Sequence, residues 1–422
     1  MNILVLGSGG REHALSWKIK QSPFCRALFV APGNAGTASI AVNVPVNPVN
    51  FDDVAELCLN EKIDMVVVGP EDPLVNGISD YFRQREDLKH ILLIGPDKNA
   101  AQLEGSKDFC KAFMVEHNIP TARYQSFTGE DLEGAYGFLD ELKPPYVLKA
   151  DGLAAGKGVL ILNDIEEAKT ELKAMFSGKF GEASRKVVIE EFLDGIEFSV
   201  FILTDGKNYH WLPVAKDYKR IGEGDTGLNT GGMGAVSPVS FVTRELRDKV
   251  EERIVKPTIK GIGNRGMDYK GFVFLGLIKV GDEPYVIEYN VRMGDPETEV
   301  VIPRIKNDLV EILKATGERR LNEVSIEEDE RMATTVMVVS EGYPGSYAKG
   351  KVVSGLQNVE ESMVFHAGTK LEGQDVVTSG GRVMAFTSYG STRQEALEKS
   401  YNSIKKVCFE GITFRRDIGY DL

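Results

Sequence analysis

The sequence predicts a multidomain protein in which a parallel α/β domain precedes α+β domains. Three observations indicate this class. The chain has 422 residues, which is too long for one hydrophobic core, so about two to four domains are expected. Roughly the first hundred residues alternate apolar runs with helical spacings, as in a parallel sheet with crossover helices. The later sequence is rich in strand hairpins, and an acidic patch at Glu327–Glu330 marks a domain boundary.

The first domain is expected to contain strands separated by helices. Short apolar runs bounded by Gly or Pro mark the strands, and apolar positions three or four residues apart mark the helices. The expected strands are Ile3–Leu6, Leu28–Ala31, Met65–Val68 and Ile91–Ile94, and the expected helices are Arg11–Lys20, Asp52–Asn60 and Leu74–Phe82. Two polar loops, 32–36 and 69–73, follow the carboxyl ends of strands, where open α/β sheets bind ligands.

The same two periodicities predict the rest of the chain. Helices are expected at 99–117, with a break at 105–107, and at 132–142, 165–176, 244–260, 309–316 and 393–406. Strands are expected at 121–127, in a hairpin of 146–149 with 159–162, throughout 187–214, and in a hairpin of 272–279 with 284–289. Several further strands after Met332 indicate a smaller C-terminal domain.

Composition and charge exclude several classes of protein. The chain carries 50 basic and 63 acidic residues, a net charge of −13, whereas a nucleic-acid-binding protein needs a basic surface. The cysteines Cys25, Cys58, Cys110 and Cys408 show no Cys-x-x-Cys spacing, so a zinc site or redox dithiol is not expected. The short apolar N-terminus reads as a strand, not a signal peptide, and no run is long enough to span a membrane. A cytoplasmic protein with reduced thiols is therefore expected.

Glu288, Asn290 and Arg292 occupy alternate positions of a predicted strand. Alternate side chains of a strand share one face, so a carboxylate, a carboxamide and a guanidinium should lie side by side. Carboxylate and amide oxygens are ligands that Mg²⁺ accepts, and a guanidinium binds phosphate or carboxylate. The intervening residues are expected to face a core: Ile287, Tyr289 and Val291. The pattern predicts half of a phosphoryl-transfer centre; the alternative is a solvated face of an antiparallel sheet.

Two glycine-rich segments could bind anions. The loop 149–159 begins and continues with lysines and contains several glycines, which lets backbone N–H groups approach phosphate oxygens. It is not a Walker A loop, because Gly158 stands where Ser or Thr is required; the alternative is a plain glycine-rich hairpin. The loop 216–238 follows the basic cluster Lys216, Lys219 and Arg220 and suits an anionic intermediate, although a flexible linker is the alternative.

Two further segments are informative. The hairpin 187–200 carries several acidic residues and could present its backbone to an adenine edge and a carboxylate to ribose, although an ordinary hairpin with surface acids is the alternative. The turn Gly7–His13 lacks the third glycine of a dinucleotide fingerprint, because Glu12 takes its place, so NAD binding is not expected. A helix N-terminus after this turn still suits a monophosphate, and His13 is expected to pack.

The order of these segments resembles that of the ATP-grasp superfamily, whose two subdomains hold ATP between them. Within it, six motifs together resemble the phosphoribosylamine–glycine ligase family: 7–14, 31–36, 69–74, 149–158, 229–235 and 288–297. The resemblance covers essentially the whole chain. The chain departs from the family pattern at Tyr218, where a His is common, and at Leu228, where a Pro is common. These departures argue against an essential imidazole in this loop.

The resemblance implies a domain division and a reaction. The implied parts are an N-terminal α/β substrate-binding domain (1–105), an ATP-grasp core (106–120 and 187–326), a mobile lid (121–186) and a C-terminal α+β domain (327–422). The implied reaction joins glycine to 5-phosphoribosylamine with ATP, through glycyl phosphate, and gives glycinamide ribonucleotide, ADP and phosphate in de novo purine synthesis. The implied partners are these small molecules alone, bound by a monomer.

The resemblance also implies site residues. ATP would contact Lys107, Lys149, Gly156, Lys157, Glu190, Glu191, Phe192, Leu193 and Glu197. Substrates would contact Gly9, Asn34, Asp72, Asn229, Gly231, Gly232 and Asp295. Catalytic roles are implied for Arg292, Lys219 and Asp217, and Glu288 and Asn290 would hold Mg²⁺ or Mn²⁺. The alternatives are another ATP-grasp ligase or carboxylase of purine synthesis, and a non-catalytic nucleotide sensor.

Overall fold

The N-terminal part of the chain forms a five-stranded parallel sheet in the order β3-β2-β1-β4-β5. The computed structural model describes residues 1–153 and 158–422. The strands are β1 (Asn2–Gly7), β2 (Ala27–Pro32), β3 (Val42–Asn43), β4 (Met65–Val68) and β5 (Leu92–Ile94), with helices α1 (Gly10–Lys20), α2 (Phe51–Asn60), α3 (Glu71–Asn76) and α4 (Ile78–Gln84). Every residue of β1 and β4 is buried, because helices cover both faces of a parallel sheet.

The helix expected at Leu74–Phe82 is instead two helices. Gly77 joins α3 to α4 with a left-handed φ of 93°, a conformation that costs glycine little and other residues more. The break turns α3 so that its first residues, Glu71 and Asp72, follow β4 directly at the carboxyl edge of the sheet. The break expected at 105–107 is confirmed, since α5 (Gln102–Gly105) ends before α6 (Lys107–Glu116), whose N-cap is Ser106.

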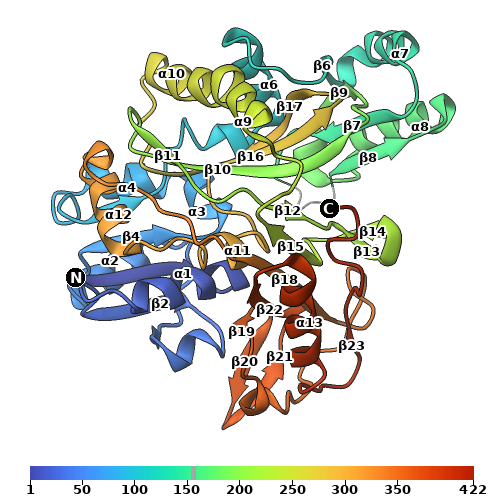
Figure 1. The fold of residues 1–422 in the computed structure, drawn as a ribbon. Coiled ribbons are helices and arrows are strands. Elements are labelled where there is room, and N and C mark those ends of the chain that lie inside the picture. The colour runs from blue at the N-terminus through green and yellow to red at the C-terminus, as the bar shows by residue number, and fades with distance from the viewer. Residues whose placement is uncertain (154–157) are drawn as a thin grey trace.

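A small four-stranded sheet with two helices stands apart at one corner of the molecule (Figure 1). Its strands, in the order β6-β9-β7-β8, are Tyr124–Thr128, Lys186–Glu191, Tyr146–Ala150 and Val159–Leu162, and its helices are α7 (Leu132–Glu141) and α8 (Ile165–Phe176). It has a hydrophobic core of its own, which includes Phe127, Phe138, Leu148 and Leu172. This unit coincides with the segment for which a lid is expected; its mobility stays a prediction.

A second antiparallel sheet, the central sheet, has the strand order β11-β10-β16-β17. It lies between the N-terminal sheet and the unit of β6 to β9 with α7 and α8, the corner unit (Figure 1). Its strands are Tyr209–Trp211, Ile196–Thr204, Gly271–Val280 and Glu283–Asn290. The helix α6 and the long helix formed by α9 (Arg244–Val250), a π-turn and α10 (Lys256–Asn264) pack on it. The short α11 (Thr298–Val301) and α12 (Leu309–Gly317) follow β17.

The C-terminal part forms an antiparallel sheet that also includes the ends of the glycine-rich loop. The path β12-β15-β18-β22-β19, with β23 beside β18, joins Lys216–Asp217, Gly234–Ser237, Met332–Ser340, Arg382–Gly390, Met363–His366 and Ile412–Thr413. Helix α13 (Arg393–Ile404) and the hairpins β13–β14 (Arg220–Gly222, Thr226–Asn229) and β20–β21 (Thr369–Glu372, Asp375–Thr378) complete it. The loop 216–238 is therefore part of this sheet at both ends, and not a free linker.

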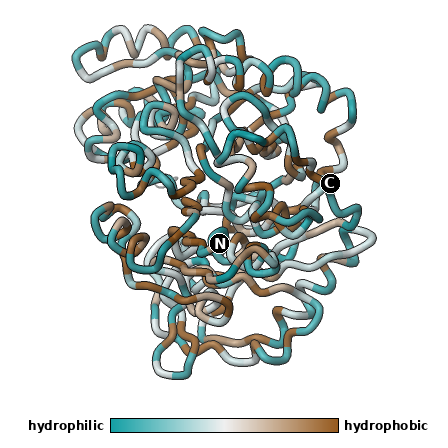
Figure 2. The backbone as a smooth tube through the Cα atoms, turned by 90° about the vertical axis from the view of Figure 1, so that its left-hand side faces the viewer, coloured by the Kyte–Doolittle hydropathy of each residue, from teal (hydrophilic) through white to brown (hydrophobic). Residues whose placement is uncertain are grey.

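Hydrophobic and hydrophilic residues are interspersed along the whole backbone (Figure 2). Among the described residues no helix combines the length and the apolar composition needed to cross a membrane. The expected class, a parallel α/β sheet followed by antiparallel sheets and a small C-terminal domain, is confirmed.

The separate core of the corner unit makes a prediction about stability. Leu172 on α8 is fully buried, so Leu172→Ala should lower the free energy of opening of residues 121–186 by about 2–5 kcal/mol through the cavity it leaves. Hydrogen exchange of peptides from this unit measures the change. The matched control is Ile161→Ala on β8, where the side chain is 44% exposed. Equal loss of protection in the two variants would contradict the packing.

Candidate active site

The strand β17 carries the expected polar trio, with one correction. Glu288 is exposed and Asn290 and Arg292 are partly exposed, whereas Tyr289 and Val291 are buried as expected. Ile287 does not join that core. Gly276 pairs with Glu288 but Leu277 pairs with Val286, so Ile287 is the extra residue of a β-bulge. The bulge shifts the alternation by one residue, so that Val286 is buried and Ile287 only half-buried.

Glu288 and Asn290 meet the requirements of a divalent cation bound together with phosphates. Glu288 forms no hydrogen bond or ion pair with another described residue. Burial lowers the pKa of Lys107, and the negative charge of Glu288 opposes this shift. Within 1–153 and 158–422, no three His, Cys, Asp or Glu side chains gather as a metal cluster. An ion held by Glu288 and Asn290 would therefore take further oxygen ligands from phosphates or water, as Mg²⁺ commonly does.

Arg292 is held by the first domain. Its Nη2 lies 2.7 Å from Glu104 Oε1 and its Nε lies 3.3 Å from Glu71 Oε2. The other oxygen of Glu104 accepts a hydrogen bond from Val291 N at 2.8 Å. Burial raises the pKa of Glu104 to about 7, although Arg292 opposes the shift. Its Nη1 donates to Met293 O at 3.1 Å, so every guanidinium nitrogen already has a partner, and the predicted catalytic role would require one of these contacts to be exchanged.

Of the predicted ATP-binding lysines, Lys149 pairs with Glu190 and Lys107 contacts the backbone just after β7. Lys149 Nζ lies 2.9 Å from Glu190 Oε1, and Lys107 Nζ donates to Gly152 O at 3.2 Å. The carboxylate of Glu190 is therefore engaged by lysine, which leaves only its backbone for an adenine edge. Gly156 and Lys157, which were also predicted to contact ATP, lie outside the described residues.

The remaining hinge residues lead from the corner unit to β10. Glu191 Oε1 accepts a hydrogen bond from Arg123 N at 2.7 Å. Phe192 is 38% exposed and Leu193 is half-buried. Their backbone is thus close to the surface at the junction of two sheets, where an adenine could bind between subdomains.

Glu197, Asp217 and Lys219 form a charged cluster. Glu197 was predicted to contact ribose, and here its Oε2 lies 2.6 Å from Lys219 Nζ. Lys219 lowers the pKa of Glu197. Burial opposes protonation of Lys219, but Glu197, Asp217 and Glu288 raise the pKa of this lysine well above its usual value. Two of the three predicted catalytic residues, Asp217 and Lys219, therefore lie near the predicted metal ligand Glu288.

A second carboxyl group adjoins this cluster. Glu297 is 4% exposed and accepts a hydrogen bond from Ser199 Oγ at 3.1 Å. Burial and the neighbouring Asp217 raise the pKa of Glu297 to about 7. Burial likewise raises the pKa of Asp217, against the attraction of Lys219. Both carboxyl groups therefore hold a proton more readily than exposed carboxyl groups do.

A pocket of about 490 Å³ separates the N-terminal and C-terminal sheets. It is lined by Ser8, Gly9, Gly33, Asn34, Asp295, Tyr343, Ala367, Gly368, Thr369, Lys370, Ser379, Gly380 and Arg382. Three predicted substrate-binding residues, Gly9, Asn34 and Asp295, are thereby brought together. Asp72 and Asn229 are exposed and do not line it. Gly231 and Gly232 lie at its edge, since Arg382 Nη1 donates to Gly231 O and the Gly231 N donates to Tyr343 Oη at 2.9 Å.

Asn34 shapes this pocket without offering a free amide. Its Nδ2 donates to Ser8 O at 2.8 Å and to His366 O at 2.7 Å, and its Oδ1 accepts from Gly36 N and Thr37 N. The side chain therefore ties the first and second loops of the N-terminal sheet to β19. The predicted contribution of Asn34 to substrate binding would therefore act through the loops that its side chain holds.

His13 packs beside the pocket, as expected. Its Nδ1 accepts a hydrogen bond from His366 N at 2.8 Å, and burial lowers the pKa of His13 to about 3. The imidazole is neutral at physiological pH, and it also meets the ring of Phe365 edge-on. It joins α1 to the C-terminal sheet.

Comparison with known proteins matches nearly the whole chain. Family models of phosphoribosylglycinamide synthetase match as an N domain over residues 1–104, an ATP-grasp (A) domain over 105–298 and a C domain over 333–421. The chain belongs to the phosphoribosylglycinamide synthetase family. The family resemblance inferred from the motifs is thereby confirmed.

Individual members of the family agree with this. Phosphoribosylamine--glycine ligase of Escherichia coli O157:H7 is 47% identical over 430 residues, which covers 100% of this chain and 98% of that protein. The Vibrio cholerae protein of the same name is 44% identical over 426 residues, with the same coverage. The crystal structure of phosphoribosylamine--glycine ligase from Thermotoga maritima superposes with a TM-score of 0.86 at 37% identity, over 99% of this chain and 100% of that one.

A more distant structure shares the fold alone. The biotin carboxylase domain of Hydrogenobacter thermophilus 2-oxoglutarate carboxylase, a complex with MgADP, ADP and bicarbonate, has a TM-score of 0.72 at 16% identity, over 98% of this chain and 91% of that one. ATP-grasp architecture is therefore common to family members and to proteins of other activities.

The sequence reasoning missed the residues that the C-terminal domain contributes to the pocket between the N-terminal and C-terminal sheets. Tyr343, Lys370 and Arg382 line it, and Arg382 Nη2 lies 3.0 Å from Asp295 Oδ1. One signal could have found it. The stretch Ser379-Gly-Gly-Arg382 repeats Ser8-Gly-Gly-Arg11, and both copies contribute to the pocket.

The two departures from the family pattern have structural explanations. Tyr218 is buried, donates its hydroxyl hydrogen bond to Asp421 Oδ1 at 2.7 Å, and receives Lys216 Nζ 4.2 Å from its ring centre. It packs the chain terminus against the glycine-rich loop. Leu228 is 65% exposed on β14 and contributes to no buried contact.

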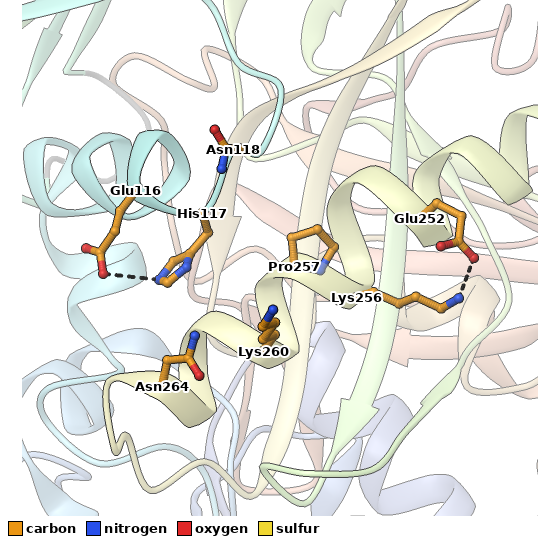
Figure 3. A pocket seen from close by; sticks show the side chains of 8 residues that line it. All are labelled: Glu116, His117, Asn118, Glu252, Lys256, Pro257, Lys260 and Asn264. Carbon is orange, nitrogen blue, oxygen red and sulfur yellow. Dashed lines mark hydrogen bonds and ion pairs between the residues drawn. The ribbon is translucent and has the colours of Figure 1, made fainter.

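Another pocket, of about 430 Å³, lies on the opposite side of the central sheet's helices and contains no predicted site residue. Figure 3 shows Glu116 and His117 at the end of α6, facing Lys256, Lys260 and Asn264 on α10. Glu252 pairs with Lys256, which neutralises part of the positive charge at this pocket. We assign it no role.

The pKa of Glu297 predicts a pH dependence of stability. Because its pKa rises from 4.5 to about 7 on folding, the folded protein binds more protons than the unfolded chain between these values. The stability from this group is fully present below pH 4.5 and lost as pH rises through 7. Glu297→Gln should remove this loss, so its melting temperature should fall less than that of the wild type between pH 4.5 and 8. The control is Glu361→Gln at an exposed site; parallel curves for wild type and Glu297→Gln would refute the assignment.

Proposed function

We propose that this chain is an ATP-dependent carboxylate–amine ligase that joins glycine to 5-phosphoribosylamine and gives glycinamide ribonucleotide, ADP and phosphate in de novo purine synthesis. The observation that carries the proposal is membership of the phosphoribosylglycinamide synthetase family along essentially the whole chain. The pocket between the two ends of the chain supports it, because it adjoins the charged cluster of the ATP-grasp core through Asp295 and Glu297.

The chemistry explains why ATP is needed. The glycine carboxylate is a poor acyl donor, because oxide would have to leave. Attack of a carboxylate oxygen on the γ-phosphorus of ATP forms glycyl phosphate and releases ADP. The nitrogen of phosphoribosylamine then attacks the acyl carbon, phosphate leaves with its bonding electrons, and the amine loses a proton. The protein acts mainly by positioning reactants and neutralising charge.

ATP would lie between the corner unit and the central sheet. Lys107 and Lys149 are buried or half-buried lysines on facing elements and suit its phosphates, whereas the backbone of 190–193 suits adenine. Glu197 could accept a hydrogen bond from the ribose of ATP if its ion pair with Lys219 is broken. Gly156 and Lys157 stay predicted ATP contacts.

Glu288 and Asn290 would hold Mg²⁺ or Mn²⁺. A bound cation neutralises the charge that builds up on the β- and γ-phosphates during transfer. The choice between the two ions is part of the proposal and does not follow from the ligands, because both accept oxygen donors. Asp217 and Lys219 would orient glycine beside this position, and Arg292 would steady the acyl phosphate.

Phosphoribosylamine would occupy the pocket between the N-terminal and C-terminal sheets. Gly9 N and Arg11 N at the start of α1 already donate to Glu12 Oε2 and Asp295 Oδ2, so its phosphate would bind beside the adjacent glycine loops. Lys370 and Arg382 add positive charge, and the carboxylate of Asp295 can accept from the amine. A monomer in the cytoplasm is part of the proposal, and the four free cysteines favour such a reducing compartment.

The decisive experiment measures ADP release by the purified protein. Release should require both glycine and freshly prepared phosphoribosylamine, and glycinamide ribonucleotide should form in equal amount. Bicarbonate with an aminoimidazole ribonucleotide should give no ADP. Release with bicarbonate instead would favour an ATP-grasp carboxylase, and nucleotide binding without turnover would favour a sensor.

The metal assignment makes a separate prediction. Glu288→Gln and Asn290→Ala should each lower kcat at least roughly a hundredfold, because the phosphates lose an oxygen-bound cation. Melting temperatures should stay near that of the wild type, since neither side chain packs in the core. Glu283→Gln, on the same strand but paired with Lys249 and Arg253, is the control and should ligate normally. Normal turnover in either site variant would contradict the assignment of a metal ion to these residues.

A further inference from the structure

A buried lysine that the proposed reaction does not use lies beneath the ATP-binding lysines. Lys111, on α6, is 2% exposed. Its Nζ lies 2.9 Å from Glu190 Oε2 and donates to Thr121 Oγ1 at 2.7 Å. A buried ammonium group is costly unless partners compensate it. Its persistence here therefore indicates a task that an apolar side chain would not perform.

Lys111 and Lys149 share one carboxylate. Lys149 Nζ lies 2.9 Å from Glu190 Oε1, and Lys111 occupies the other oxygen. All three side chains are more than nine-tenths buried. Despite burial, the two lysines hold the pKa of Glu190 below its usual value, so the carboxylate is charged. Two ammonium groups and one carboxylate leave a net positive charge within the protein.

Lys111 also links two parts of the fold. Lys149 lies on β7 and Glu190 on β9, both in the corner unit, whereas Lys111 belongs to α6, which packs on the central sheet. Thr121, which accepts from Lys111, donates in turn to Val286 O on β17 at 2.8 Å. The ammonium of Lys111 is thus fixed relative to the strand that carries Glu288 and Asn290.

We propose that Lys111 is a positioning residue for ATP, which acts through Glu190 to keep the ammonium of Lys149 available to the nucleotide phosphates. The inference rests on the proposed function for its placement of ATP beside Lys149. With Lys111 present, Glu190 is shared, the triad keeps one positive charge uncompensated, and phosphate supplies the missing anion. Without Lys111, Glu190 and Lys149 form a neutral pair, which weakens the attraction for phosphate.

The test compares nucleotide binding by wild type and Lys111→Met, a replacement of similar length without charge. Calorimetry with ADP and with adenosine separates phosphate recognition from adenine recognition. The dissociation constant for ADP should rise roughly tenfold or more, because Glu190 then pairs with Lys149 alone and neutralises its charge, whereas that for adenosine should change less than about twofold. In the ligation assay the KM for ATP should rise and the KM for glycine should not.

The matched control is Lys256→Met, which removes an exposed lysine paired with Glu252 on α10. It should bind ADP as the wild type does. Equal weakening of ADP and adenosine by Lys111→Met would mean a structural role in the hinge, and unchanged ADP binding would mean no role at all. Either result overturns the proposal.

A double-mutant cycle tests whether Lys111 acts through Glu190. In the Glu190→Gln background Lys149 is unpaired whether or not Lys111 is present, so K111M/E190Q should bind ADP within about threefold of E190Q. A larger loss would overturn the proposed route. This pair also provides the test if Lys111→Met alone does not fold, because the double variant buries no unpaired carboxylate. Nucleotide binding is measured without ligation, so failure here is distinct from failure of the proposed reaction.

Discussion

The segment that follows β17 is held by charged groups from both ends of the chain, and the site depends on this attachment. Arg292 is paired with Glu104 and Glu71 of the N-terminal part, Arg11 Nη1 donates to Met293 O at 3.1 Å, and Arg382 of the C-terminal sheet is paired with Asp295. These partners are largely buried. Removing one member of such a pair leaves a charge without compensation in a low-dielectric region, which is strongly unfavourable. The N-terminal sheet, the central sheet and the C-terminal sheet are therefore constrained to meet at residues 291–297.

This arrangement places two kinds of anion site in a row. On one side, Lys107, Lys149 and Lys111 outnumber the carboxylate of Glu190. On the other side, the pocket at the N-terminus of α1 combines backbone N–H groups with Lys370 and Arg382. Between them lie acidic groups, Asp217 and Glu297, with Lys219. An anionic nucleotide at one end, a sugar phosphate at the other and a zwitterionic amino acid between them complement this alternation of charge.

The C-terminal domain takes part in the site because of topology and not because of proximity in sequence. The glycine-rich loop enters and leaves through β12 and β15, which are strands of the C-terminal sheet. The same sheet places Arg382 at the first position of β22, beside Gly231. The domain that the sequence alone presents as a packing unit thus provides eight of the 13 residues that line the pocket.

The sequence by itself determined the class of the fold, the order of its elements and the shared face of Glu288 and Asn290, because these follow from periodicities of a few residues. It also determined the family, through motifs such as 149–158 and 288–297. Only the tertiary structure decided that Ile287 forms a β-bulge and that two lysines pair with Glu190. It also decided that the amide of Asn34 forms hydrogen bonds with backbone groups and that Arg382 completes the pocket. Those features come from contacts between residues far apart in the chain. Local spacing carries no information about which distant charge or carbonyl a side chain will meet once the sheets have packed.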